Sequence, residues 1–247
     1  MNFTILRFES IASTNTEALN QARQGASEGL CIVARQQTAG RGRHGRSWIS
    51  GKDAGLYFSL ILRPNIENKF LPLITLMTAV AVFDSLAELY KLQPDIKWAN
   101  DVHVKEKKIC GILAEMCETK RGLAIAVGIG INLKSSSFPP ELKATATSIE
   151  EEIGGMPNVE NLLENLTKQL AIRYQMFEAE NGAEKIRNEW AKRSSYFTGK
   201  CIRVTLENEI IYGTSDGLEE NGALRVRLEN GAVKIVQTGE VERLRKI

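Results

Sequence analysis

The chain has 247 residues, of which 43% are hydrophobic and 25% charged, ordinary proportions for a globular protein with one or two domains. Its formal net charge of +2 says little about partners, and it does not indicate bulk affinity for nucleic acid. The N-terminus lacks the apolar core of a signal peptide. The longest apolar stretch, around residues 70–83, is interrupted by Pro72 and too short to span a bilayer. We therefore expect a cytoplasmic protein without a membrane segment.

The cysteines and histidines indicate no metal centre. The cysteines form no C-x-x-C pair and lie in largely apolar runs, which predicts core thiols in a reducing compartment: Cys31, Cys110, Cys117 and Cys201. The two histidines, His44 and His103, are far apart in the sequence, which argues against a zinc site.

The first quarter of the chain is typical of strands with one intervening helix. Apolar and β-branched runs predict strands at residues 3–8, 30–37 and 55–62. Ser13 or Thr14 is a candidate N-cap, because each precedes an Ala- and Leu-rich segment at residues 17–22. One interpretation is that these residues serve only to cap the helix. The functional alternative is that the free backbone N–H groups of the helix start face a ligand.

Residues 37–48 form a loop of unusual composition, Gln-Thr-Ala-Gly-Arg-Gly-Arg-His-Gly-Arg-Ser-Trp. Its glycines permit positive φ and close backbone approach, and its arginines offer forks of donors that suit carboxylate and phosphate. No Asp or Glu lies between Glu28 and Asp53, so the arginines have no acidic partner nearby in the sequence. We predict a lid that repels itself and is mobile when empty, and that closes when it clamps an anion.

The middle of the chain predicts a buried helix and a hairpin. Residues 69–90 are apolar on nearly all sides, which favours a central buried helix. Short strand candidates at 95–100 and 102–104 precede the charged segment 105–108. We expect this segment to be a turn that leads into a strand at 109–116.

Residues 122–133 alternate glycine with β-branched residues, as in Val127-Gly128-Ile129-Gly130-Ile131-Asn132. Glycine weakens a strand unless something must approach the backbone closely. We therefore expect a ligand to lie over this strand.

The sequence pattern changes in the C-terminal part, from loop and helix to short strands. Residues 134–147 are polar and contain prolines, which predicts a loop, and amphipathic helices follow at 159–180 and 184–192. Asn-containing turns then separate short predicted strands at 200–206, 209–218, 223–228 and 232–236. This tail is typical of a small all-β barrel. We place a domain boundary near Tyr196, giving domains 1–195 and 196–247.

Several familiar motifs are excluded. Residues 40–45 match G-x-G-x-x-G, but a dinucleotide fold needs a helix directly afterwards, and residues 46–51 are poor helix formers. There is no Walker loop, and no Ser-His-Asp or Cys-His constellation is supported.

Taken together, the remaining motifs closely resemble the biotin protein ligase family over nearly the whole chain. The matching stretches are Ser13-Thr14-Asn15, Gln37 through Trp48, Lys97-Trp98-Ala99-Asn100-Asp101, Lys108-Ile109-Cys110-Gly111-Ile112-Leu113 and Gly128-Ile129-Gly130-Ile131-Asn132. The Gly-Arg-Gly-Arg-x-Gly-Arg-x-Trp loop is the specific one. The family usually has proline at the position of Ala99. Many bacterial members also carry an N-terminal helix-turn-helix domain, and its absence here implies the monofunctional type without DNA binding.

The resemblance implies an α+β fold: a mixed β-sheet flanked by helices, similar to class II synthetases, followed by an SH3-like β-barrel. It implies an ATP-dependent ligase that forms biotinyl-5′-AMP and then transfers biotin to a lysine of the biotin carboxyl carrier protein of acetyl-CoA carboxylase. Mg²⁺ is expected with the ATP, and no protein ligand to the metal is assigned. A homodimer is possible.

The resemblance also implies roles for residues. Biotin is expected to contact Ser13, Thr14, Asn15, Gln37, Arg41, Gly42, Arg43, Lys108 and Gly111. ATP is expected to contact Arg43, Arg46, Trp48, Lys97, Asn100 and Asn132, with Trp48 covering the adenine and the two asparagines reading its edge. Lys108, Arg43 and Asp101 are the candidate catalytic residues. Lys108 would contact the biotin carboxylate and the α-phosphate, and Asp101 would lie near the metal or the incoming lysine.

Two alternatives stay open at this point. A lipoate or octanoate ligase shares the broad fold, although the Gly-Arg loop favours biotin. A module of another class would use Arg41, Arg43 and Arg46 to grip the phosphates of a nucleic acid, with Trp48 stacked on a base. The near-neutral net charge counts against the second alternative.

Overall fold

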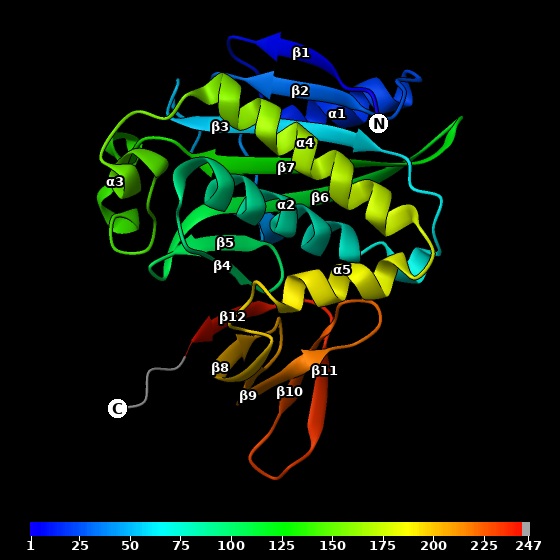
Figure 1. Ribbon diagram of the computed structural model, residues 1–247, viewed down its shortest axis with the longest axis vertical. Helices are drawn as coiled ribbons and strands as arrows, with labels where there is room; N and C mark the ends of the chain where they lie inside the picture. The colour runs from blue at the N-terminus through cyan, green and yellow to red at the C-terminus, as the bar shows by residue number, and fades with distance from the viewer. Residues whose placement is uncertain (244–247) are drawn as a thin grey trace.

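A computed structural model describes residues 1–243. Its centre is a seven-stranded sheet in the order β1-β2-β3-β7-β6-β5-β4 (Figure 1). The β1–β2 pair is parallel and the other neighbours are antiparallel, so the sheet is mixed, as predicted. The strands are β1 (Thr4–Phe8), β2 (Leu30–Ala34), β3 (Gly55–Leu62), β4 (Pro94–Lys97), β5 (Asp101–Val104), β6 (Lys107–Thr119) and β7 (Gly122–Asn132).

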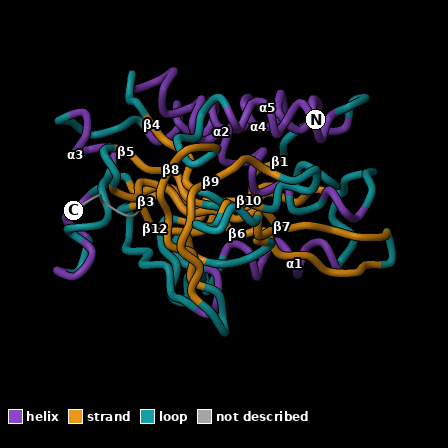
Figure 2. The backbone as a smooth tube through the Cα atoms, turned by 90° about the horizontal axis from the view of Figure 1, so that it is seen from below, coloured by secondary structure: helices purple, strands orange, loops and turns teal. Residues whose placement is uncertain are grey.

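Helices cover both faces of this sheet (Figure 2). One face packs against α2 (Leu73–Tyr90), which α4 (Val159–Glu178) and α5 (Gly182–Ala191) cover in turn. The opposite face packs against the shorter α1 (Thr14–Arg23), and a further short helix, α3 (Ile149–Ile153), follows the loop that we predicted at 134–147. The fold class predicted from the sequence is therefore confirmed.

The central helix α2 is apolar all round because it is buried between the sheet and two other helices. With 18 residues, the helix is long and apolar enough to cross a membrane by length and composition alone. However, 61% of it is buried inside the protein. The hydroxyls of Thr78 and Ser85 donate to the backbone carbonyls of Ile74 and Ala81 one turn earlier, which satisfies them within the core. The helix begins at Leu73 rather than at residue 69, since Pro72 occupies its N-cap.

Strand alternation separates the two faces and explains the glycines of β7. Val127, Ile129 and Ile131 point to the α2 side and are buried there. Ala124 and Ala126 lie under α1, where small side chains let the helix approach. Beyond the end of α1, the same face continues with Gly128, Gly130 and Asn132, so this end of the sheet is left open for a site.

The predicted hairpin forms, but its turn is shorter than expected. The turn consists of Lys105 and Glu106, with φ of 50° and 66°, as a two-residue turn with both central residues at positive φ requires. Lys107 and Lys108 therefore belong to β6 and not to the turn. This correction matters because it fixes Lys108 in a strand.

The C-terminal part is a five-stranded antiparallel sheet, as the predicted small β domain requires. Its strands are β8 (Thr198–Thr205), β9 (Ile210–Leu218), β10 (Leu224–Arg227), β11 (Val233–Val236) and β12 (Glu240–Arg243). The sequence analysis missed β12. Residues 244–247 of the predicted second domain lie outside the described part of the chain.

The two parts of the chain share one hydrophobic core. Residues of α2 and of the C-terminal sheet belong to the same cluster of buried side chains. The Trp98 indole N–H donates to the Gly222 carbonyl at 2.9 Å, and a side chain at Gly222 would meet Leu73 and Leu76 of α2. The peptide bond between Trp98 and Ala99 is cis. The division at residues 195/196 stays a prediction, because the core continues across it.

Candidate active site

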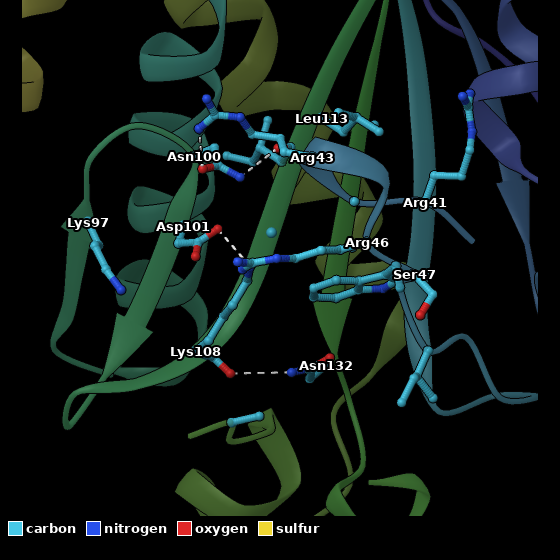
Figure 3. Close-up of a pocket in the computed structure, with 18 of the residues that line it drawn as sticks. Arg41, Arg43, Arg46, Ser47, Lys97, Asn100, Asp101, Lys108, Leu113 and Asn132 are labelled. Atoms are coloured by element: carbon cyan, nitrogen blue, oxygen red, sulfur yellow. Dashed lines mark hydrogen bonds and ion pairs between the residues drawn. The ribbon is translucent and has the colours of Figure 1, made fainter. Parts of the chain in front are cut away.

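A cavity of about 860 Å³ opens at the uncovered end of the sheet, on the α1 side (Figure 3). Its walls come from β4 to β7, the start of α1, the glycine–arginine loop, residues 138–146 and the start of β12. All residues that the sequence analysis assigned to biotin, ATP or catalysis line this one cavity: Ser13, Thr14, Asn15, Gln37, Arg41, Gly42, Arg43, Arg46, Trp48, Lys97, Asn100, Asp101, Lys108, Gly111 and Asn132. Their individual roles stay predictions.

The glycines of the site face admit protein side chains, which corrects the expectation that a ligand lies on them. A Cβ atom at Gly130 would come within 2.5 Å of the Trp48 ring, and one at Gly111 within 2.9 Å. A Cβ at Gly128 would come within 2.5 Å of Asn15 Oδ1. The indole and the amide therefore lie flat on the strand, and a ligand meets these groups before it meets the backbone.

A polar network forms one end of the cavity. Gln37 Oε1 accepts from the Thr14 backbone N–H at 2.8 Å and from the Thr14 hydroxyl at 3.1 Å. Gln37 Nε2 donates to Ser50 Oγ at 2.9 Å, and Ser50 donates to the Trp48 carbonyl at 3.0 Å. Ser13 caps α1 by accepting from the Thr16 N–H at 3.4 Å. The prediction of free N–H groups at the helix start is therefore partly wrong, because the Thr14 backbone N–H donates to Gln37.

Asn15 continues this network across the floor of the cavity. Its Oδ1 accepts from Ser59 Oγ at 2.7 Å. Its Nδ2 donates to the Leu113 carbonyl at 3.0 Å and to Glu115 Oε2 at 2.9 Å. Both amide protons are therefore used, and a ligand that reaches this amide must offer a donor to Oδ1.

The glycine–arginine loop folds as a narrow hairpin that we call the flap, residues 40–48. Trp48 N–H donates to the Gly40 carbonyl at 2.9 Å, and Gly42 N–H donates to the Arg46 carbonyl at 2.6 Å. At the tip, His44 and Gly45 have φ of 54° and 71°, left-handed values that glycine favours. A side chain at Gly40 would come within 2.4 Å of the Trp48 carbonyl, so the base of the flap also needs glycine.

Each arginine of the flap has a partner from a distant part of the chain. Arg41 Nη2 lies 2.8 Å from Glu115 Oε2. Arg43 donates to Asn100 Oδ1 at 3.0 Å and to the Thr238 hydroxyl at 3.2 Å. The expectation of a flap that repels itself is therefore corrected: its charge has no partner nearby in the sequence but has partners in the fold.

The flap also contacts the C-terminal domain through a charge pair. Arg46 donates through both terminal nitrogens to the two carboxylate oxygens of Glu240, with 2.6 Å between Nη1 and Oε1. These hydrogen bonds lower the pKa of Glu240 and raise that of Arg46. The C-terminal domain thus takes part in the cavity wall.

Three charged side chains share the sheet face beneath the flap (Figure 3). Lys108 Nζ lies 2.7 Å from Asp101 Oδ1 as an ion pair without the alignment of a hydrogen bond. The same ammonium lies 5.4 Å from the centre of the Trp48 ring, within cation–π range. Burial lowers the pKa of Lys97, and the nearby carboxylate of Asp101 offsets part of this shift. This cluster places positive charge beside a planar aromatic surface.

The backbone of Lys108 pairs with the segment around Ala146. Its N–H donates to the Thr145 carbonyl at 2.8 Å, and its carbonyl accepts from the Thr147 N–H at 2.9 Å. Asn132 Nδ2 donates to the carbonyls of Lys108 at 3.3 Å and Thr147 at 3.0 Å. Asn132 is therefore oriented with its amide group tied to the backbone, which leaves Oδ1 as its acceptor for a ligand.

The sequence analysis missed several residues of the site, and one of them had a visible signal. Ser59 is fully buried in the apolar strand β3, where a single serine among Leu, Ile and Phe marks a polar contact. Glu115, Thr238 and Glu240 gave no such signal. His103 also lines the cavity, and burial together with Lys97 lowers its pKa to about 4, so its ring is neutral at physiological pH.

Within residues 1–243, no group of three or more His, Cys, Asp or Glu side chains comes together to hold a metal ion. Among the acidic side chains that line the cavity, Asp101 and Glu240 are each paired with a cation. The described residues thus assemble no set of three protein ligands for a metal ion.

Comparison with known proteins accounts for both parts of the chain. Residues 7–132 match the biotin/lipoate A/B protein ligase family, and residues 197–244 match the biotin protein ligase C-terminal domain. The chain is 36% identical over 228 residues to the bifunctional ligase/repressor BirA of Bacillus spizizenii, covering 91% of this chain and 70% of that protein. It is 34% identical to the biotin–[acetyl-CoA-carboxylase] ligase of Paracoccus denitrificans, covering 93% of this chain and 96% of that protein.

A solved structure shows the same arrangement. The biotin protein ligase from Aquifex aeolicus in complex with biotin and ATP superposes with a TM-score of 0.84 at 30% identity, covering 98% of this chain and 99% of that one. The site residues, the two family matches and this structural agreement lead to the same result. The chain belongs to the biotin/lipoate A/B protein ligase family and, within it, to the biotin protein ligases.

Proposed function

We propose that this biotin ligase forms biotinyl-5′-AMP from biotin and ATP and then transfers the biotinyl group to a lysine of a biotin carboxyl carrier protein. The observation that carries the proposal is one cavity with a neutral polar network at one end, a lysine–aspartate pair in the middle and a cationic flap above. The Aquifex relative, which binds biotin and ATP together, supports a shared cavity for both substrates.

The polar end suits the ureido ring of biotin. The ring offers two N–H donors and one carbonyl acceptor, and Asn15 Oδ1 is an acceptor fixed in place by its saturated amide group. Thr14 and Gln37 hold each other beside it, and Arg41 with the Gly42 backbone lies above. A few fixed polar groups in an otherwise apolar pocket provide orientation and specificity.

In the first step, a carboxylate oxygen of biotin attacks the α-phosphorus of ATP. A C–O–P linkage forms, the bond from the α-phosphorus to the bridging oxygen breaks, and pyrophosphate leaves with the electron pair. Two anions must approach each other, so positive groups around both stabilise the transition state. Lys108 supplies this charge by exchanging Asp101 for the α-phosphate, while Arg43 and Arg46 contact the phosphates from the flap. Mg²⁺ would enter with the ATP phosphates as part of the nucleotide substrate.

The adenine is expected to stack on the face of Trp48 that points away from Gly130. Asn132 Oδ1 then accepts from the adenine amino group, since the Asn132 amide protons are tied to the backbone. Asn100 uses Oδ1 for Arg43 and Nδ2 for the Ile112 carbonyl, at 3.0 and 3.1 Å. Its contribution to nucleotide binding is therefore through the position of Arg43.

In the second step, the amine of the carrier lysine attacks the acyl carbon of the adenylate. A C–N bond forms, the C–O bond to the phosphate breaks, and AMP leaves. Asp101, released when Lys108 turns to the phosphate, is placed to accept a proton from the incoming ammonium. The closed flap keeps water from the reactive anhydride until the carrier arrives. The name of the Paracoccus relative supports acetyl-CoA carboxylase as the source of the carrier.

The test is isotope exchange between ATP and pyrophosphate with biotin, lipoate or octanoate as the acid, followed by transfer to a purified carrier domain. We expect exchange with biotin alone, and label on the carrier lysine. Exchange with lipoate or octanoate instead of biotin would assign the other branch of the family. Activity that needs no acid, together with tight salt-dependent binding of nucleic acid, would favour the arginine-loop module.

A further inference from the structure

We propose that Glu115 is a positioning residue that couples the biotin pocket to the flap. This inference rests on the proposed function of the pocket. One carboxylate oxygen, Glu115 Oε2, accepts from Asn15 Nδ2 at 2.9 Å and from Arg41 Nη2 at 2.8 Å. The first donor belongs to the ring-binding end of the cavity and the second to the flap, so a single atom connects the two.

Glu115 acts from outside the reaction cavity. It does not line the cavity that holds the predicted site residues, and instead lines a neighbouring one of about 510 Å³ on the other side of the flap. Its side chain is 25% exposed and that of Arg41 is 45% exposed, so water reaches the ion pair mainly from the side of the arginine. A direct contact with substrate is thus not its function.

The same oxygen closes a continuous path of hydrogen bonds between the two ends of the flap. From the Trp48 carbonyl, the path runs through Ser50 and Gln37 to the Thr14 backbone N–H. It continues through the Thr14 and Ser59 hydroxyls, whose oxygens lie 2.8 Å apart, to Asn15 and Glu115. Arg41, near the other end of the flap, completes it. A ligand that shifts any of these groups therefore changes where both ends of the flap can lie.

The carboxylate also fixes which way the Asn15 amide faces. A serine hydroxyl such as Ser59 can donate or accept, so it does not choose between the two orientations of an amide. Ionised Glu115 and the Leu113 carbonyl can only accept, so together they hold Nδ2 toward themselves and Oδ1 toward Ser59 and Gly128. Loss of the negative charge leaves the Leu113 carbonyl alone to hold Nδ2, which weakens this selection, and it removes the attraction for Arg41 at the same time.

The test compares Glu115→Gln with Glu118→Gln, an equal change of charge at an exposed position of the same strand. Biotin binding is measured by titration calorimetry, and the KM for ATP by pyrophosphate exchange at saturating biotin. We expect the Kd for biotin to rise about tenfold in Glu115→Gln, as for a lost charged hydrogen bond, with the KM for ATP within about twofold of wild type. Biotin should also protect the flap of this variant from trypsin less than it protects wild type. Glu118→Gln should match wild type.

A double-mutant cycle shows whether the effect passes through Arg41. In an Arg41→Gln background, the further change Glu115→Gln should raise the Kd for biotin by a smaller factor than in wild type. A Glu115→Gln protein with wild-type affinity and flap protection would overturn the inference. So would parallel losses in biotin affinity, ATP KM and thermal stability, which a merely structural role would give. Failure of the wild type to bind biotin would instead overturn the proposed function.

Discussion

Arg46 of the flap and Glu240 at the start of β12 form a bidentate ion pair. This pair connects the catalytic part of the chain to the C-terminal domain. The carboxylate occupies the kind of position that a phosphate would take against the same guanidinium. The C-terminal domain therefore holds the flap by the same group that is expected to grip ATP.

Replacement of Glu240 by Gln should loosen the empty flap. The pair is partly exposed, and exposed pairs contribute up to about 1 kcal/mol, so tryptic cleavage between residues 41 and 46 should accelerate by up to about fivefold without ligand. Glu229→Gln, at an exposed turn of the same domain, is the matched control. Addition of biotin and ATP should slow cleavage in all three proteins. Equal rates for Glu240→Gln and wild type without ligand would show that the pair does not restrain the flap.

Replacement of Lys108 by Met should nearly abolish adenylation. The side chain keeps most of its length and its apolar stem but loses the charge that faces the carboxylate and α-phosphate, for which a loss of about 10²–10³ in rate is expected. Lys107→Met is the control, because Lys107 pairs with Glu151 at 3.3 Å away from the cavity. The measurement is the kcat of biotin-dependent pyrophosphate exchange. A Lys108→Met enzyme within about tenfold of wild type would remove this residue from the chemistry.

Replacement of Gly130 by Ala should displace the Trp48 ring, since the added Cβ would lie 2.5 Å from it. The adenine then loses its stacking surface, and the KM for ATP should rise by about tenfold, as for a lost base–aromatic stack. Gly155→Ala adds the same methyl group where nothing lies within 4 Å, and should have no effect. An unchanged KM in Gly130→Ala would mean that Trp48 does not support the adenine.

The buried ring of His103 should make the protein less stable in mild acid. Its pKa falls from 6.5 to about 4 in the folded protein, so between these values the unfolded chain binds a proton that the folded chain does not. Its contribution is fully present above pH 6.5 and is lost as the pH falls toward 4. His103→Gln should reduce this part of the slope in urea unfolding measured from pH 7.5 to 4. His44→Gln, at the exposed tip of the flap, should not.

The sequence predicted the elements of the fold well because their signals are local. Alternation marked the long strands, and apolar character on all sides marked the central helix α2. The strand β12 was missed because three of its four residues, Glu240–Arg243, are charged and show no apolar alternation. The glycines of β7 were read correctly as a place of close approach, but the approaching groups are Asn15 and Trp48.

The residues of the site were predicted from motifs, and the groups that hold them were not. The partner of Arg41 is 74 residues away in the chain and that of Arg46 is 194 residues away. Pairing at such separations depends on the sheet order and on the docking of the C-terminal domain, which no local pattern contains. Ser59 is the exception, because a lone serine in a buried apolar strand is visible in the sequence.

The hairpin geometry of the flap determines how its motion would be observed. The N–H groups of Gly42 and Trp48 are bonded within the flap, so they stay bonded when it swings as a unit and would exchange with deuterium only if it unravels. Thr38 and Ala39 directly precede the flap, and we call them its hinge. Their N–H groups donate to the carbonyls of Ile11 and Ala12, at 2.9 and 2.8 Å. Amide exchange at this hinge pair therefore reports opening, and exchange at Gly42 and Trp48 reports local unfolding.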